Sequence, residues 1–109
     1  MKTRIITRHC EISQSLRDRT HEVLDKLDRF DPRITAVDVT FDEQKRLRRV
    51  DGLVKVLGDD PVVAHAEAED FREALDALGE RLAKILRRRR SQLVDRKGPK
   101  LSEVVVNPE

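Results

Sequence analysis

Alternating hydrophobic and polar positions predict four strands in this chain. The alternation covers residues 2–8, 34–42, 50–57 and 62–68. In the fourth of these segments, alanines share one face with Val62, and such small side chains would let a helix pack closely against the strand.

Apolar residues at helical spacing predict two helices between and after these strands. The first is expected to begin after Ser13, a favourable N-cap residue, and to run to about Phe30. The second is expected to begin after Asp70, which forms a capping box with Glu73. The expected buried positions are Leu16, Thr20, Val23, Leu27 and Phe30 in the first helix, and Phe71, Leu75, Leu78, Leu82 and Ile85 in the second.

The resulting element order, β-α-β-β-β-α, indicates an α+β fold. A β-α-β start implies one parallel strand pair, and the three later strands can form an antiparallel meander. We therefore expect a four-stranded mixed sheet with two helices on one face, like a double-stranded-RNA-binding domain, and an open second face. The charged residues 43–49 are expected to form a hairpin loop. One domain should span residues 1–95, followed by a flexible C-terminal tail over 96–109.

Charge is strongly polarised along the chain, although the formal net charge is only +2. Residues 84–100 contain eight Lys or Arg and one acid, a charge of +7, so the rest of the chain carries −5. The exposed face of the second helix is acidic in its first half and cationic in its second half. A cationic end on a small domain indicates a polyanionic partner, and RNA is the leading candidate.

The four consecutive arginines 87–90 are the main candidate binding feature. Cations at a helix C-terminus are stabilised by the helix dipole by about 0.3–1 kcal/mol each, so a solvated helix end is the simpler alternative. Four adjacent arginines repel one another, however, and their planar guanidinium groups suit phosphate. For the cations of the first strand and first helix, ordinary solvated charges are an equally open alternative. The candidate RNA-binding residues are Arg81, Lys84, Arg87, Arg88 and Arg90 in the second helix, Lys26 and Arg29 in the first helix, and Arg4 and Arg8 in the first strand.

Other chemistry has little support in the sequence. The three histidines and Cys10 lack the spacing of metal ligands, and no glycine-rich phosphate loop occurs. No pair of carboxylates lies on apolar ground that would suit acid–base catalysis. We therefore predict a protein that is not an enzyme, with no catalytic residues, no metal or other cofactor and no small-molecule substrate.

Aromatic residues are scarce, with three Phe and no Trp or Tyr. Phe30, Phe41 and Phe71 all lie on expected core stripes. Because recognition of unpaired bases generally uses exposed aromatic rings, we predict that RNA is recognised by its backbone and shape.

The expected location is the cytoplasm. No apolar run approaches the roughly 20 residues that span a bilayer, so no membrane partner is expected. A single cysteine cannot form an internal disulfide, which is typical of a reducing compartment.

Two segments carry motifs of a known family. The first is IITRHCEISQSLR at 5–17, with KLDRF at 26–30; the second is AEAEDFREALD at 66–76, with RLAK at 81–84. These segments resemble the short ribosome hibernation-promoting factors, also called the ribosome-associated inhibitor or sigma-54 modulation family. The resemblance covers about residues 2–93, with Phe71-Arg72 in place of the family's usual Met-Tyr.

The resemblance implies a non-enzymatic translation factor whose partners are the small ribosomal subunit and its rRNA. Such proteins lie in the decoding groove and block mRNA and tRNA during starvation or stationary phase, and a ribosome modulation factor is a further candidate partner. Two alternatives stay open. One is a protein-interaction or dimerisation module, and the other is a general binder of structured RNA.

Overall fold

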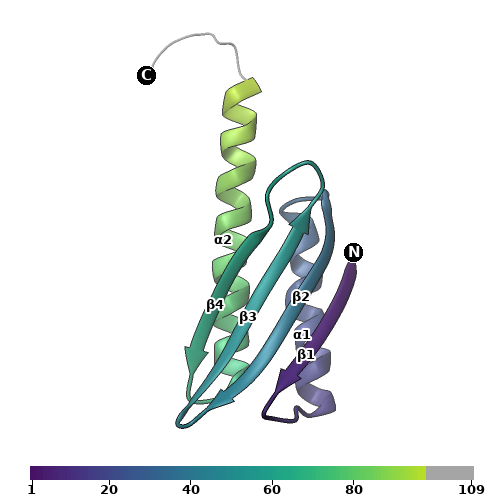
Figure 1. Ribbon diagram of the computed structural model, residues 1–109. Helices are drawn as coiled ribbons and strands as arrows, with labels where there is room; N and C mark the ends of the chain where they lie inside the picture. The colour runs from purple at the N-terminus through teal and green to yellow at the C-terminus, as the bar shows by residue number, and fades with distance from the viewer. Residues whose placement is uncertain (98–109) are drawn as a thin grey trace.

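In the computed structural model, two helices cover one face of a four-stranded sheet and leave the other face open (Figure 1). The structure describes the backbone of residues 1–97 and the side chains of residues 1–92. The expected tail at 96–109 falls almost wholly outside the described residues and stays a prediction. The elements are β1 (Lys2–Arg8), α1 (Gln14–Asp25), the 3₁₀ helix η1 (Lys26–Arg29), β2 (Ile34–Gln44), β3 (Leu47–Val56), β4 (Val62–Ala68) and α2 (Phe71–Lys97).

The strand order across the sheet is β1-β2-β3-β4, the same as in the chain. Strand β1 is parallel to β2, whereas β2–β3 and β3–β4 are antiparallel. The expected β-α-β-β-β-α order, mixed sheet and one-sided helix layer are therefore confirmed. Alternation along the strands explains why the helices cover one face only. Val37, Val39 and Phe41 of β2 point to the same face, and all three are fully buried under the helices.

Side chains become smaller across the middle of the sheet, beneath α2. One row of paired residues runs from Ile5 through Val39 and Gly52 to Ala64. A Cβ atom at Gly52 would lie only 3.1 Å from Leu82 Cδ1 of α2. The small residues of β3 and β4 therefore allow α2 to lie directly on the sheet, as the alanines of β4 predicted.

Both helix starts are capped as the sequence predicts. The backbone N–H of Leu16 donates to Ser13 Oγ at 3.1 Å, and that of Glu73 donates to Asp70 Oδ1 at 2.8 Å. Each cap satisfies one of the free N–H groups in the first helical turn.

The first helix differs from the expected continuous helix to Phe30. The α-helix ends at Asp25, and η1 continues as a 3₁₀ helix. Leu24 lies in the last turn of the α-helix, four residues after the buried Thr20, and Leu27 lies in η1. Both leucines are buried, although Leu24 was not among the expected core positions.

The expected loop at 43–49 is wrong, because the strands on both sides continue into this segment. Strand β2 extends to Gln44 and β3 begins at Leu47, so only Lys45 and Arg46 form the turn. Lys45 has a φ of 43°, in the left-handed region that tight hairpin turns use. Charged residues are tolerated in these strands because the hairpin tip is exposed, so their side chains remain solvated.

Helix α2 also lies very close to α1. A Cβ atom added at Gly79 would lie 2.5 Å from Val23 Cγ1. Val23 is β-branched and its χ1 is restricted in a helix, so its side chain has little freedom to move away. Gly79 is therefore required by packing, not by backbone conformation.

We expect Gly79→Ala to destabilise the protein by about 1–3 kcal/mol through overpacking. At an exposed helical site the same change would stabilise by about 1 kcal/mol, so the sign is diagnostic. Urea denaturation of the variant measures the effect. In a Val23→Ala background the change should cost much less, and an equal cost in both backgrounds would contradict the proposed contact.

A buried carboxylate secures the connection between η1 and β2. Asp31 is fully buried, and its two oxygens accept hydrogen bonds from the Arg33 backbone N–H and from the Arg33 guanidinium at 2.9–3.0 Å. The hydrogen bonds from the Arg33 side chain lower the pKa of Asp31 more than burial raises it. Arg33 also approaches Asp59 of the β3–β4 turn at 3.9 Å.

The lowered pKa of Asp31 predicts a stability contribution that depends on pH. A carboxylate whose pKa is lower in the folded state stabilises the fold above its unfolded pKa, and this contribution is lost as pH falls through the folded pKa. We therefore expect Asp31→Asn to be less stable than the parent protein at pH 7. The difference in free energy of unfolding should shrink as the pH is lowered from about 5 toward 2. A difference that is independent of pH would show that Asp31 acts through packing alone.

Candidate nucleic-acid interface

The C-terminal ends of both helical segments lie at the same end of the domain. Strand β2 runs parallel to β1, and β4 runs antiparallel to β3, so α1 and α2 both lead away from the β2–β3 hairpin. Figure 1 shows α2 continuing beyond the end of the sheet at the side where η1 ends. This topology brings the late cations of the two helices together.

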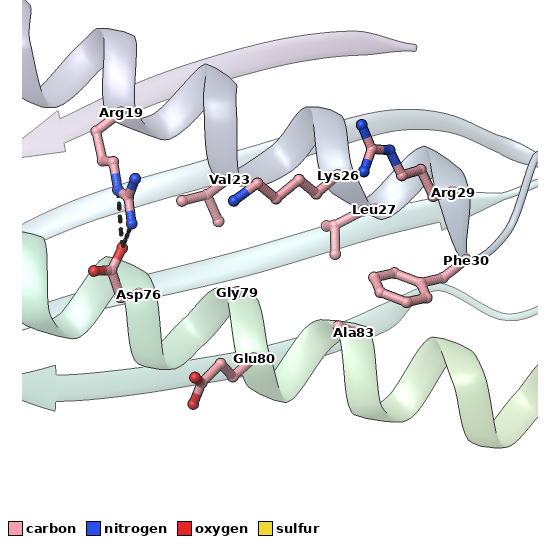
Figure 2. A pocket seen from close by; sticks show the side chains of 10 residues that line it. All are labelled: Arg19, Val23, Lys26, Leu27, Arg29, Phe30, Asp76, Gly79, Glu80 and Ala83. Atoms are coloured by element: carbon pink, nitrogen blue, oxygen red, sulfur yellow. Dashed lines mark hydrogen bonds and ion pairs between the residues drawn. The ribbon is translucent and has the colours of Figure 1, made fainter.

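A groove of about 390 Å³ separates α1 and η1 from α2. Figure 2 shows Lys26 and Arg29 along one side of it and Glu80 on the α2 side. At one end of the groove, Arg19 donates to Asp76 Oδ1 at 3.2 Å. This ion pair joins the helices at the acidic part of α2, so the groove is neutralised at that end and cationic at the other.

A second cleft of about 450 Å³ continues beyond η1. It is bounded by Arg29, Phe30 and Pro32 on one side and by Arg87 and Arg90 of α2 on the other, with Ser91 beside them. Arg29 and Phe30 line both cavities, so the two lie next to each other. We call Lys26, Arg29, Arg87 and Arg90 the basic end; all four were predicted from the sequence as RNA contacts.

Phe30 has a more exposed position than the sequence indicated. It packs against the core but is only half-buried, and the Arg87 guanidinium carbon lies 5.3 Å from the centre of its ring. This distance is within the range of a cation–π contact. Phe30 is the last apolar residue of the first helical segment, just before Asp31-Pro32. This position is the sequence signal that its side chain would be only partly buried.

Other predicted contacts lie on the opposite side of α2. Arg81 donates from Nη1 to the backbone carbonyl of His65 on the edge strand β4. Arg88 is seven residues later and therefore lies on the same side of the helix as Arg81. Lys84 and Arg88 are exposed. The cations of α2 thus form two groups, one beside α1 and one beside β4.

Arg89 has a structural role. Its guanidinium donates to the backbone carbonyls of Asp60 and Pro61, and Nη1 lies 3.7 Å from Asp59 Oδ1. Arg89 therefore joins α2 to the β3–β4 turn beyond the end of the sheet.

Arg4 and Arg8 lie on the open face of the sheet, away from both helices. Arg4 donates to Asp38 Oδ2 at 3.1 Å on the neighbouring strand. Farther across this face, Arg49 donates a hydrogen bond to Asp51, and this bond raises the pKa of Arg49. The open face therefore has mixed charge, and the structure does not bring Arg4 or Arg8 together with the basic end.

Within the described residues, no group of three or more His, Cys, Asp or Glu side chains is placed to hold a metal ion. In this part of the chain, no helix combines the length and the hydropathy needed to cross a membrane.

Comparison with known proteins assigns the family. Residues 3–94 match the family described as sigma 54 modulation protein / S30EA ribosomal protein. The chain therefore belongs to this family, which confirms the relationship that the two sequence motifs indicated.

Its relatives agree in sequence and fold. A protein named ribosome hibernation promoting factor from Pseudomonas putida is 33% identical over 92 residues, which cover 84% of this chain and 89% of the relative. A ribosomal subunit interface protein from Coxiella burnetii has a similar structure, with a TM-score of 0.78 and 25% identity, covering 84% of this chain and 99% of that chain. The N-terminal domain of Protein Y from Thermus thermophilus gives a TM-score of 0.73 at 26% identity, covering 81% and 98%.

Arg88 and Arg89 are adjacent, but substitutions at the two positions should affect stability differently. We expect Arg89→Gln to lower the free energy of unfolding by about 1–2 kcal/mol, because carbonyls of the β3–β4 turn would be left without their donor. Arg88→Gln removes the same charge from an exposed position and should change stability by less than about 0.5 kcal/mol. Thermal and urea denaturation measure both variants. Equal effects would show that charge repulsion along the helix, not the hydrogen bonds to the turn, controls stability.

Proposed function

We propose that this protein is a ribosome-associated hibernation factor that binds rRNA of the small subunit through its basic end. The convergence of two cations from η1 with two from α2 carries this proposal. Family membership and the relatives named for ribosome hibernation and the ribosomal subunit interface support the ribosome as the partner.

The charge distribution supports docking in one orientation. Phosphates would bind at the basic end, while Glu80 and the acidic first half of α2 would be repelled from RNA. Each phosphate that is neutralised releases condensed counterions, so the complex should weaken steeply with salt and be reversible. Arginine at three of the four positions suits bidentate contacts with phosphate oxygens.

The remaining predicted contacts would extend this footprint. Lys84 and Arg88 would reach RNA on the β4 side of α2, whereas Arg81 already donates to a backbone carbonyl. Arg4 and Arg8 on the far face of the sheet would contact only RNA that surrounds the domain, as the walls of a groove do.

The proposed mechanism is steric and involves no chemical step. Bound in the decoding groove, a domain of this size would exclude mRNA and tRNA, and this would take place in the cytoplasm during starvation or stationary phase. A ribosome modulation factor would be an additional partner. The family relationship supports this finer assignment.

We expect neutralisation of the basic end to weaken ribosome binding. The double variant Arg87→Gln/Arg90→Gln should bind purified small subunits at least about tenfold more weakly at low salt. The slope of log affinity against log salt should fall by about two, because the variant would neutralise two fewer phosphates. Co-sedimentation with small subunits over a salt series measures both quantities.

A matched control removes the same charge at the opposite end of the domain. Arg46 of the β2–β3 turn and Arg72 of the first turn of α2 are exposed. The β2–β3 turn and the start of α2 lie at the end of the sheet away from the C-terminal part of α2 (Figure 1). Arg46→Gln/Arg72→Gln should leave most of the binding intact. Equal weakening by the two double variants would indicate binding by net charge, as in a general RNA binder. No binding by the parent protein would favour a protein-interaction module instead.

A further inference from the structure

The cleft beyond η1 has an unusual composition for a surface depression. Its charged side chains are three arginines, Arg29, Arg87 and Arg90, and its lining includes Phe30. Among the described residues, no carboxylate lines it. Its volume of about 450 Å³ falls within the range of about 300–1,000 Å³ that is typical of small-ligand sites. One nucleotide is a ligand of suitable size and charge.

Phe30 and Arg87 form a cation–π contact at the edge of this cleft. The Phe30 ring packs against the core and is therefore held in place, and the Arg87 guanidinium lies over it at 5.3 Å. Arg87 is an exposed residue, so its side chain remains accessible to a ligand. Unpaired bases stack on aromatic rings and on arginine planes in RNA-binding proteins. A base that stacks on Arg87 would extend the Phe30–Arg87 pair by one layer.

Arg29 and Arg90 flank this surface from opposite sides of the cleft. Neither forms an ion pair with any residue whose side chain the structure describes. The positive charge of Arg90 helps to lower the pKa of Asp31, but both Asp31 oxygens are already hydrogen-bonded to Arg33. The two guanidinium groups are therefore available to an external anion, and phosphate matches their donor geometry.

We propose that this cleft binds a single unpaired nucleotide, with its base stacked on Arg87 and its phosphate between Arg29 and Arg90. The origin of the nucleotide rests on the proposed function, under which it is an unpaired residue of structured RNA. A free nucleotide presents the same chemistry and is the competing source. The inference revises the expectation that RNA is recognised by its backbone and shape alone, because Phe30 is not confined to the core.

The test compares three RNA hairpins of identical stem: fully paired, with one bulged adenosine, and with one abasic bulge. Binding of the full chain to labelled RNA is measured by fluorescence anisotropy. The parent protein should bind the adenosine bulge about fivefold or more tighter than either other hairpin, since stacking contributes substantially for each base. The abasic hairpin controls for the flexibility and phosphate spacing of a bulge. Equal affinity for the adenosine and abasic bulges would overturn the proposal.

Adjacent arginines of α2 provide matched variants. Arg87→Lys keeps the charge but removes the planar group over Phe30, so the preference for the adenosine bulge should disappear. Arg88→Lys makes the same change on the β4 side of the helix and should retain the preference. Phe30→Leu removes no charge but removes the ring beneath Arg87, so it should lower the preference for the adenosine bulge. If Arg87→Lys and Arg88→Lys behave alike, or if Arg87→Lys keeps the preference, the stack does not bind the base.

Two further measurements identify the source of the nucleotide and test the proposed function independently of the cleft. Adenosine monophosphate should compete with the bulged hairpin only at concentrations far above those of the RNA; equal affinity would assign the cleft to free nucleotides and overturn the RNA source. Co-sedimentation with small subunits is measured in parallel. Ribosome binding without a bulge preference rejects the cleft assignment alone, whereas a bulge preference without ribosome binding rejects the proposed function and leaves the cleft assignment standing.

Discussion

The close packing of α2 against the sheet and against α1 is the constraint on which the other features depend. Two glycines make it possible: Gly52 leaves space for Leu82, and Gly79 leaves space for Val23. Interiors at crystal-like density do not accommodate an extra methyl group without displacement of neighbours. The axis of α2 is thereby determined over the sheet, and its continuation past the sheet inherits that direction. Arg89 then holds the helix to the β3–β4 turn where the sheet no longer supports it.

The same packing separates the charges of the domain. The Arg19–Asp76 ion pair joins the helices near the acidic part of α2, and the groove becomes cationic toward η1. Because both helices point the same way, their cations accumulate at one end. On the open face, by contrast, paired strands place Arg4 beside Asp38. The uneven charge on the helix side thus arises from the direction of the helices, and the balanced charge on the open face of the sheet arises from strand register.

Features that depend on local pattern could be predicted from the sequence, whereas those that depend on distant contacts could not. Alternation and capping residues are local, which is why the strand order and the starts at Ser13 and Asp70 were predicted correctly. The short hairpin was missed because charge was interpreted as loop, although a positive φ at Lys45 completes a two-residue turn. The burial of Leu24 was missed because the preceding residue, Val23, was assigned to the buried stripe, although Leu24 follows Thr20 at helical spacing.

For the candidate site, the cations were recognisable but their grouping was not. Arg87 and Arg88 are adjacent in sequence, and only the position of α1 relative to α2 decides which of them meets Phe30. The partial exposure of Phe30 likewise follows from where η1 ends. A single sequence shows neither the position of α1 relative to α2 nor the residue at which η1 ends.

The contact between Arg81 and the carbonyl of His65 has a consequence for self-association. Strand β4 is an outer strand of the sheet, and outer strands present unpaired backbone groups that can template the addition of a further strand. Arg81 occupies one of these acceptors and places a positive charge beside the strand. Two copies that approached each other along β4 would have to displace this arginine and bring like charges together. The helix that carries the cations therefore also disfavours the addition of a further strand along the β4 edge.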